Sequence, residues 1–337
     1  MSIYKSRKSK QEFENFPGKV EELKKLFLEM PSKHEKPLSK ITIINYVNKL
    51  NKLSTIVLGH GWNGKTDWLK NATSVIKSIE ESDATGKKDL ITPVVKLLKT
   101  IDASQELIAE YQKGMSVFKD AEYKIISKNK ATPKEVEQSI PYGEIISKIN
   151  DYKPTDEMTL IYKLICSLYF QNSLVPRNDL PIMKFVSNNK KVNQMNTDFN
   201  YITLDKNKTP IDIIMKHYKS RNTYGTQKFP ITPEVRSLLK DYIKMYNKQP
   251  GDFLFVMKDG KPFSKPNFLG LLGNATEAVL GKKMLVDRIR QIQISHFYNG
   301  GMRSIEDNEA DSKRYLHSKD THLEYMKTNL PQDDDDT

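Results

Sequence analysis

The sequence predicts an α+β fold that is mainly α-helical, with one small antiparallel sheet, arranged as a helical domain followed by a mixed domain. Three observations predict it. Apolar residues recur at helical spacing through most of the chain. Between residues 201 and 231 the pattern changes to short segments rich in β-formers and separated by polar turns. The length of 337 residues exceeds that of one typical domain, so two are expected.

The first half is predicted to contain a flexible basic arm and a short helix over 1–37, then a helical domain over 38–130. Ser39, Thr66 and Ser104 each precede a run of helical spacing, and a hydroxyl side chain at that place caps a helix. The pattern predicts four or five helices joined by short loops, a domain small enough to bury one core.

A linker is predicted at 129–133, the segment NKATP. A second domain is expected over 134–327, with an acidic tail over 328–337. Its first helices are expected at 134–149 and 155–170, where apolar residues again follow helical spacing.

Three short strands are expected to form the sheet, at 201–204, 211–217 and 228–231, because polar turns separate them. Thr232 and Pro233 then begin another helix, with proline in the first helical position. Helices are expected to continue from there to the end of the domain.

The composition favours a polyanionic partner and excludes several classes of protein. The net charge is +12, and phosphate neutralisation supplies most non-specific affinity for nucleic acid. The mean hydropathy is −0.61, and no apolar run reaches the roughly 18 residues that span a bilayer. The one cysteine, Cys166, excludes an intramolecular disulfide framework and a Cys-rich zinc site. An intracellular protein that is not secreted is expected, because no apolar segment follows the basic N-terminus.

Four segments in the second half contain residue types suited to phosphoryl chemistry without a metal. They are SLYFQNSLVPRNDL (167–180), IDIIMKHYKSRNTYGTQKFPI (211–231), VDRIRQIQISHFYN (286–299) and RYLHSKDTHLEYMK (314–327). In this order they resemble the catalytic domain of tyrosine recombinases, the phage-lambda-type integrase family that breaks and rejoins DNA. The resemblance covers about 134–327. The first half is similar to the family's core-binding domain only in size, position and helix content.

The resemblance implies a role for each matched residue. Arg177 would be the first catalytic arginine, with Asp179 orienting the local backbone or the arginines. Arg290 would be the second arginine, His317 would hydrogen-bond the scissile phosphate, and Tyr325 would be the nucleophile that forms a 3′-phosphotyrosine.

The family also places a lysine in a turn of the sheet, where it protonates the leaving 5′ oxygen. Lys216, Lys219 and Lys228 are the candidates here. Lys219 matches best because it follows the strand and opens the turn, and the choice among the three remains open.

The chain departs from the family pattern at several of these positions. Asp287 stands where the family's His-x-x-Arg has its histidine, and an ionised aspartate accepts a hydrogen bond but donates none. Leu316 stands where a glycine is usual before the histidine, and Leu174 to Pro176 replace the usual Thr-Gly-Leu. Arg288 is an alternative register for the second arginine.

The residue types fit the chemistry. Arginines bind phosphate oxygens bidentately, and a lysine and a histidine add directed donors, so charge that develops on a phosphodiester is stabilised without a metal. The covalent intermediate retains the phosphodiester energy, so no ATP is needed. No phosphate-binding loop of the Gly-x-x-x-x-Gly-Lys type is present in the sequence, and no cofactor is expected.

The sequence therefore predicts a site-specific DNA recombinase or integrase acting on double-stranded DNA, as a tetramer on two sites by the resemblance. Its composition is most similar to integrases of virophages or large eukaryotic DNA viruses, which would place it in a nucleus, viral factory or virion. The alternatives are a type IB topoisomerase-like enzyme and a catalytically degenerate DNA-binding module. Asp287 is the strongest argument for the degenerate module.

Overall fold

The computed structural model describes residues 38, 40–62, 66–299 and 305–333. The chain divides into two compact units, Met1–Ser127 and Lys128–Thr337. The arm and helix predicted for 1–37, the cap predicted at Ser39 and the last acidic residues lie outside the described ranges.

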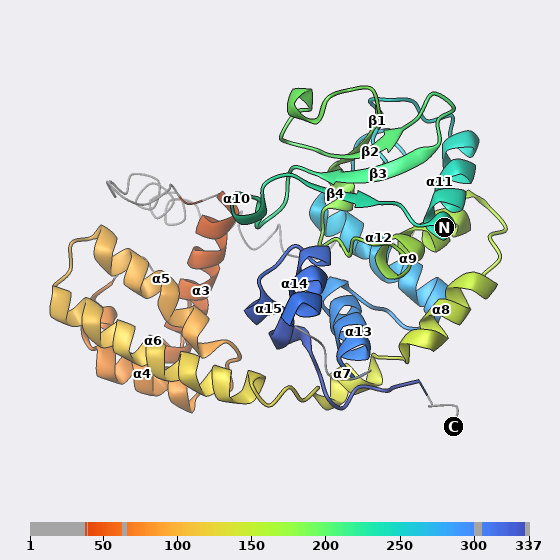
Figure 1. Cartoon of the computed structure of the whole chain (residues 1–337). Helices are drawn as coiled ribbons and strands as arrows, with labels where there is room; N and C mark the ends of the chain where they lie inside the picture. The colour runs from red at the N-terminus through yellow and green to blue at the C-terminus, as the bar shows by residue number, and fades with distance from the viewer. Residues whose placement is uncertain (1–37, 39, 63–65, 300–304, 334–337) are drawn as a thin grey trace. The chain divides into compact units, whose positions relative to one another are not determined.

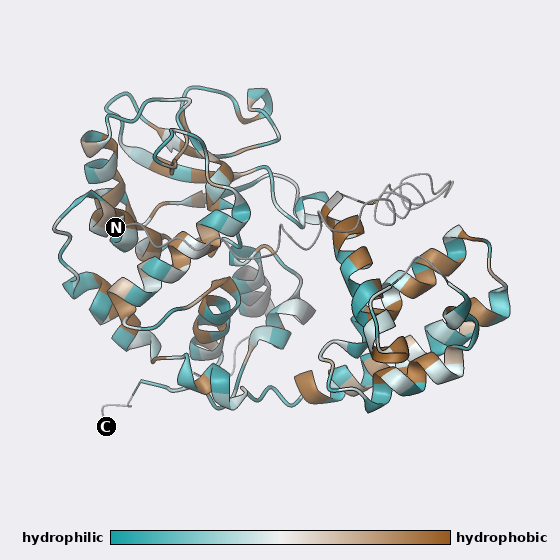
Figure 2. Cartoon of the chain, turned by 180° about the vertical axis from the view of Figure 1, so that it is seen from behind, coloured by the Kyte–Doolittle hydropathy of each residue, from teal (hydrophilic) through white to brown (hydrophobic). Residues whose placement is uncertain are grey.

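The described part of the first unit is helical. It contains α3 (Lys40–Leu58), the 3-10 helix η1 (Asp67–Lys70), α4 (Ala72–Glu81), α5 (Lys87–Thr100) and α6 (Gln105–Ile126). Hydrophobic and hydrophilic residues alternate along these helices (Figure 2), as expected of helices with one buried face. Leu53, Val75, Ile91 and Tyr111 are among the side chains that form their common core.

Two predicted helix starts in this unit have different outcomes. Ser104 caps α6 as predicted, since its side chain accepts a hydrogen bond from the Leu107 N–H. The single helix predicted after Thr66 is wrong, because the segment is broken at Asn71. The Asn71 side chain accepts from the Ser74 N–H and begins α4 there, whereas the Thr66 side chain makes no cap.

The second unit combines helices with a small sheet, so the described residues form the predicted α+β fold. Its helices are α7 (Pro133–Glu137), α8 (Tyr142–Asp151), α9 (Glu157–Phe170), α10 (Arg221–Tyr224), α11 (Pro233–Met245), α12 (Lys265–Leu280), α13 (Val286–Asn299), α14 (Ile305–Arg314) and α15 (Lys319–Tyr325). Two 3-10 turns, η2 (Leu180–Ile182) and η3 (Val192–Gln194), flank the first strand. The single helix predicted over 134–149 is wrong, because Pro141 separates α7 from α8.

The sheet has four strands in the order β1–β2–β3–β4: β1 (Met183–Ser187), β2 (Asn200–Leu204), β3 (Pro210–Met215) and β4 (Gln227–Pro230). The prediction of three antiparallel strands is therefore wrong in two respects. β1 was not predicted, and it pairs with β2 in parallel, whereas β2–β3 and β3–β4 are antiparallel. Parallel neighbours need a crossover connection, which residues 188–199 provide. Lys216 fixes this crossover by donating to the carbonyls of Val192 and Met195, both at 2.7 Å.

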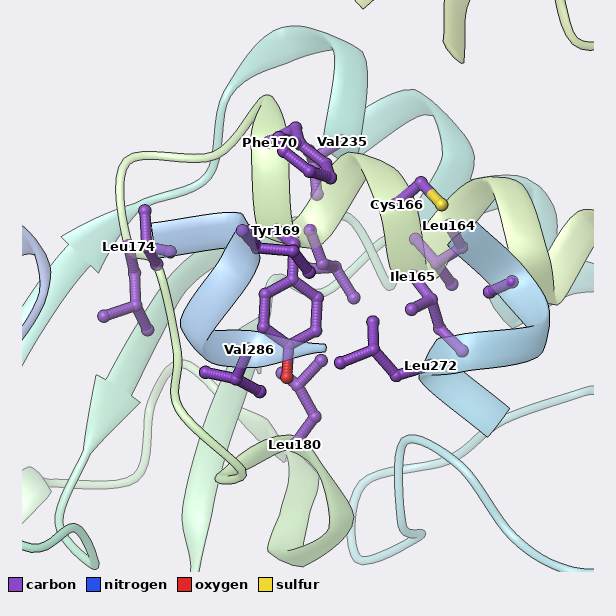
Figure 3. Close-up of a cluster of buried hydrophobic side chains, with 14 of the residues drawn as sticks. Leu164, Ile165, Cys166, Tyr169, Phe170, Leu174, Leu180, Val235, Leu272 and Val286 are labelled. Carbon is purple, nitrogen blue, oxygen red and sulfur yellow. The ribbon is translucent and has the colours of Figure 1, made fainter. Parts of the chain in front are cut away.

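Helix α9 lies at the centre of the second unit. Its last turns, from Leu164 to Phe170, are entirely buried. Figure 3 shows side chains of α9 in one cluster with Leu174 from the following loop, Val235 of α11, Leu272 of α12 and Val286 of α13. Because the loop after α9 and the start of α13 share this core, their positions relative to each other are fixed.

The acidic tail predicted over 328–337 lies partly outside the described ranges, and its described residues, 328–333, contact the rest of the second unit. Leu330 is buried in the core. The Asn329 side chain accepts from the Ala131 N–H at 2.6 Å and donates to the Ala131 carbonyl at 3.2 Å. Asp333 accepts from the Gly143 N–H at the start of α8. The segment that follows α15 is therefore attached to the residues before α7 and to the start of α8.

Candidate active site

The backbone around Arg177 is fixed by two hydrogen bonds to its main-chain atoms. The Tyr169 hydroxyl, in α9, donates to the Arg177 carbonyl at 2.6 Å. The Asp179 carboxylate accepts from the Arg177 N–H at 3.0 Å. Burial raises the pKa of Asp179 although this hydrogen bond and the neighbouring Arg290 oppose the rise. The Asp179 carboxylate is thus hydrogen-bonded to the backbone at Arg177, and its part in a reaction stays a prediction.

Arg290 is fully buried on α13 and joins three segments of the chain. Its Nη2 donates to the carbonyls of Val175 at 2.9 Å and of Tyr315 at 2.8 Å. Its Nη1 faces Nδ1 of His317 at 3.5 Å. Burial and the charge of Arg177 lower the pKa of Arg290, and an arginine nevertheless stays protonated in a protein.

The two arginines have unpaired N–H donors and two positive charges that suit an anion. The Nε–H groups of Arg177 and Arg290 are both buried, and neither has a hydrogen-bond partner among the residues that the structure describes. The charge of Arg177 acts on Arg290, so two positive charges lie close together. A buried donor left unsatisfied costs roughly 1–3 kcal/mol. Arg177 is partly exposed, so an anion with several acceptor oxygens, such as a phosphodiester, can approach its guanidinium, and the nearby charge of Arg290 adds to the attraction.

His317 and Tyr325 both lie beside Arg290 and beside each other. The ring of His317 stacks on that of Tyr325 with 5.6 Å between centroids, and the Arg290 guanidinium lies 5.9 Å from the centroid of the Tyr325 ring. Figure 1 shows α13, α14 and α15, which carry or flank these residues, grouped together in the second unit. The structure therefore brings Arg177, Arg290, His317 and Tyr325 together from segments far apart in the sequence.

Asp287, at the position where the resemblance expected a histidine, contacts the phenol of Tyr325. The Tyr325 hydroxyl donates to Oδ1 of Asp287 at 3.1 Å. Asp287 lies one turn before Arg290 on the exposed side of α13. Burial is the main cause that raises the pKa of Tyr325, the negative charge of Asp287 raises it further, and Arg290 opposes both. The phenol is thus neutral and donates its hydrogen bond to a carboxylate.

The three candidate lysines differ sharply in their surroundings. Both Lys216 contacts are with backbone carbonyls of the crossover, so its ammonium is committed to the fold. Lys228 pairs with Asp212 at 3.0 Å. Lys219 is exposed in the connection between β3 and β4. The next residue, Ser220, donates to the Leu316 carbonyl, which places the Lys219 turn beside the His317 segment.

Leu316 adopts a backbone conformation that favours glycine. Its φ is +52°, in the left-handed region that costs an L-residue about 1–2 kcal/mol. The resemblance expects glycine at this position, and the buried Leu316 side chain packs in the main core instead. The backbone turn that precedes His317 is therefore kept although the glycine is not.

Two parts of the site were not predicted from the sequence. His322 was set aside in favour of His317, yet Nε2 of His317 lies 2.8 Å from Nδ1 of His322. The Ser220 contact with Leu316 joins residues 96 positions apart, a separation that no local pattern reveals. Arg288, the alternative register, points elsewhere and pairs with Glu135 at 3.5 Å.

Over the described ranges, no group of three or more His, Cys, Asp or Glu side chains is arranged to hold a metal ion. In the same ranges, no helix is long and apolar enough to cross a membrane.

Comparison with known proteins gives structural matches but no match to a family model or a curated sequence. The chain is similar to the crystal structure of XerA recombinase, with a TM-score of 0.38 and 14% identity over 92% of this chain and 94% of that one. A likeness at this level carries no argument for function, so the function of the chain is inferred from the geometry of the second unit.

Proposed function

We propose that the second unit cleaves and rejoins DNA strands through a covalent phosphotyrosine, as a site-specific recombinase or integrase. One observation carries the proposal. Two adjacent arginines, whose buried Nε–H groups have no partner among the described residues, lie next to a histidine and to a tyrosine whose phenol is hydrogen-bonded to a carboxylate. This set contains an anion site, a nucleophile and a proton acceptor, which are the parts that phosphoryl transfer requires.

The proposed step is a direct displacement at phosphorus. The Tyr325 oxygen attacks the phosphorus, and its proton passes to the Asp287 carboxylate, with which it is already hydrogen-bonded. The bond from phosphorus to the 5′ oxygen breaks, and Lys219 donates a proton to that oxygen. The DNA 3′ end stays attached to Tyr325. Attack by a 5′ hydroxyl reverses each transfer and rejoins the strand without ATP or a metal.

The arginines stabilise the charge that develops on the non-bridging oxygens. Arg290 is rigid, since carbonyls of two segments hold its Nη2, so little reorganisation accompanies the reaction. Arg177 offers a side chain whose backbone is restrained. The partner is double-stranded DNA, to which the net charge of +12 is suited, and a homotetramer on two DNA sites is the assembly proposed.

Asp287→Asn should change the pH dependence of cleavage. The amide cannot take the phenol proton, and loss of a general base costs about 10²–10⁴ in rate. Burial still keeps the Tyr325 pKa above its ordinary value, so phenolate is scarce at neutral pH. Its fraction grows about tenfold per pH unit below that pKa. The single-turnover cleavage rate of the variant should therefore rise steeply with pH above neutrality, while the wild-type rate stays nearly level.

The control for this measurement is Asp241→Asn, an exposed aspartate on α11, which should behave as the wild type. If Asp287→Asn cleaves at the wild-type rate with the wild-type pH profile, Asp287 does not accept the proton.

Lys219→Met should lose cleavage of ordinary DNA and recover it on a substrate with sulfur as the bridging 5′ atom. A thiolate leaves without a proton, so the lysine is dispensable for that substrate only. Lys228→Met, which removes the ion pair with Asp212, is the matched control and should cleave both substrates. For each variant, the ratio of the single-turnover cleavage rates on the sulfur-containing and the ordinary substrate is measured. Equal defects on both substrates would show that Lys219 is not the proton donor.

The function itself is tested with a DNA substrate nicked close to the cleavage site. After attack, the short piece between the cleavage site and the nick, which bears the 5′ hydroxyl, diffuses away and cannot rejoin. Since the recognition sequence must first be found, a pool of random duplexes is used and the retained sequences are read. The expected result is protein–DNA adduct that survives denaturant. Salt-dependent binding without adduct would favour the degenerate DNA-binding module. Relaxation of supercoiled DNA by a monomer, without joining of two sites, would favour the topoisomerase-like enzyme.

A further inference from the structure

Two histidines of the second unit form a buried pair beside Arg290. His317 is 2% exposed and His322 is 1% exposed. Nε2 of His317 lies 2.8 Å from Nδ1 of His322, so one of these nitrogens donates a proton to the other. Ser318 caps α15 between them by accepting from the Thr321 N–H. This cap fixes where the helix begins and thus where His322 lies relative to His317.

The neighbours of His317 determine which nitrogen carries its proton. Its Nδ1 faces Nη1 of Arg290 at 3.5 Å, and a guanidinium only donates. Burial, together with Arg290, lowers the pKa of His317 to about 2, so the imidazole is neutral and has a single N–H. A proton on Nδ1 would point at the donor groups of Arg290. The proton therefore lies on Nε2, and His317 donates it to Nδ1 of His322.

Aromatic packing leaves the ring little room to reorient. Tyr315 stacks against His317 with 5.5 Å between ring centroids, and Tyr325 stacks at 5.6 Å. With the ring plane held by these two tyrosines, the donors of Arg290 and the acceptor Nδ1 of His322 together favour the Nε2–H tautomer, so loss of the His322 acceptor leaves it only partly favoured.

We propose that His322 is a positioning residue that holds His317 as the Nε2–H tautomer, so that His317 orients Arg290 through its Nδ1 lone pair and does not itself donate to the phosphate. This inference rests on the proposed function for its catalytic consequence, and it revises the role that the resemblance implies for His317. The only N–H of His317 is committed to His322, and phosphate binding falls to the two arginines.

The tautomer can be read directly, without DNA. Protein labelled with ¹⁵N at histidine contains only 6 such residues, and a long-range ¹H–¹⁵N correlation spectrum distinguishes a protonated from an unprotonated ring nitrogen. The His317 signals are assigned as those lost in His317→Asn. In the wild type, Nε2 of His317 should carry the proton and Nδ1 should not.

Two variants separate a hydrogen-bonding role from a packing role. His322→Asn keeps an acceptor, because the Asn Oδ1 takes the place of Nδ1, and it should preserve the tautomer and cleave within a few-fold of the wild-type rate. His322→Leu fills the same buried place with an apolar side chain that has no acceptor. It should give a mixed tautomer and slow cleavage by roughly tenfold or more, as for partners that orient a functional histidine. His296→Asn, at a histidine stacked on Tyr142, is the control for labelling and folding.

The proposal is overturned if wild-type His317 carries its proton on Nδ1, or if His322→Leu retains the wild-type tautomer. Where His322→Leu does not fold, the wild-type spectrum and His322→Asn still decide, since loss of the Nε2–H form in His322→Asn contradicts the assignment. If none of the proteins cleaves DNA, the proposed function fails, while the spectra still decide the role of His322.

Discussion

Tyr325→Phe is expected to abolish the covalent protein–DNA adduct and all strand rejoining. The variant lacks the oxygen that attacks phosphorus, and no water-mediated reaction yields an adduct. The fold should persist, because among the described residues the hydroxyl is hydrogen-bonded to Asp287 alone, and a typical hydrogen bond contributes about 0.5–1.5 kcal/mol. Denaturing gel electrophoresis with nicked DNA measures the adduct, and thermal unfolding checks the fold.

The matched control is Tyr123→Phe, which changes an exposed tyrosine of α6 in the first unit and should form adduct at the wild-type rate. An adduct formed by Tyr325→Phe would mean that another residue is the nucleophile. His322→Leu cannot serve in place of Tyr123→Phe, because it changes a residue of the site.

Arg177→Ala is expected to slow strand cleavage by about 10²–10³, the usual cost of removing one donor to a developing oxyanion. Its stability should change little. The described contacts of Arg177 with Tyr169 and Asp179 are made by its backbone, which the substitution retains. Single-turnover cleavage measures the effect. Partial recovery in added guanidinium, below denaturing concentrations, would identify the lost group as the guanidinium.

Arg288→Ala is the matched control, since Arg288 lies on the same helix as Arg290 and pairs with Glu135. It should cleave at a rate close to that of the wild type. If Arg288→Ala cleaved more slowly than Arg177→Ala, the register that assigns Arg290 to the site would be wrong. Arg290→Ala is a poorer probe, because it leaves the carbonyls of Val175 and Tyr315 without their donor and lowers stability as well as rate.

Local patterns in the sequence were sufficient for much of the fold. Helical spacing located α3, α6, α9 and α11, and α6 and α9 begin at a capping side chain. Strand β1 was missed although it is as long as β2, because its parallel pairing with β2 and the crossover that Lys216 holds join separate segments of the chain. Neither feature has a local signature.

The predicted site residues converge for reasons that only the packed core reveals. Arg177 and Arg290 meet because the loop after α9 and α13 share one core, and the Val175 carbonyl links them. The order of motifs along the chain predicted this convergence by resemblance. The Asp287 contact with Tyr325 and the His317–His322 pair depend on side-chain directions. A sequence without an alignment does not determine those directions.

The most direct test of the central claim is to identify the amino acid that carries DNA in the trapped adduct. The adduct is digested with protease and nuclease, and the nucleotide-bearing peptide is sequenced by mass spectrometry. We predict a single modified residue, Tyr325, linked to a DNA 3′ phosphate. Attachment to another residue, or to a 5′ phosphate, would contradict it.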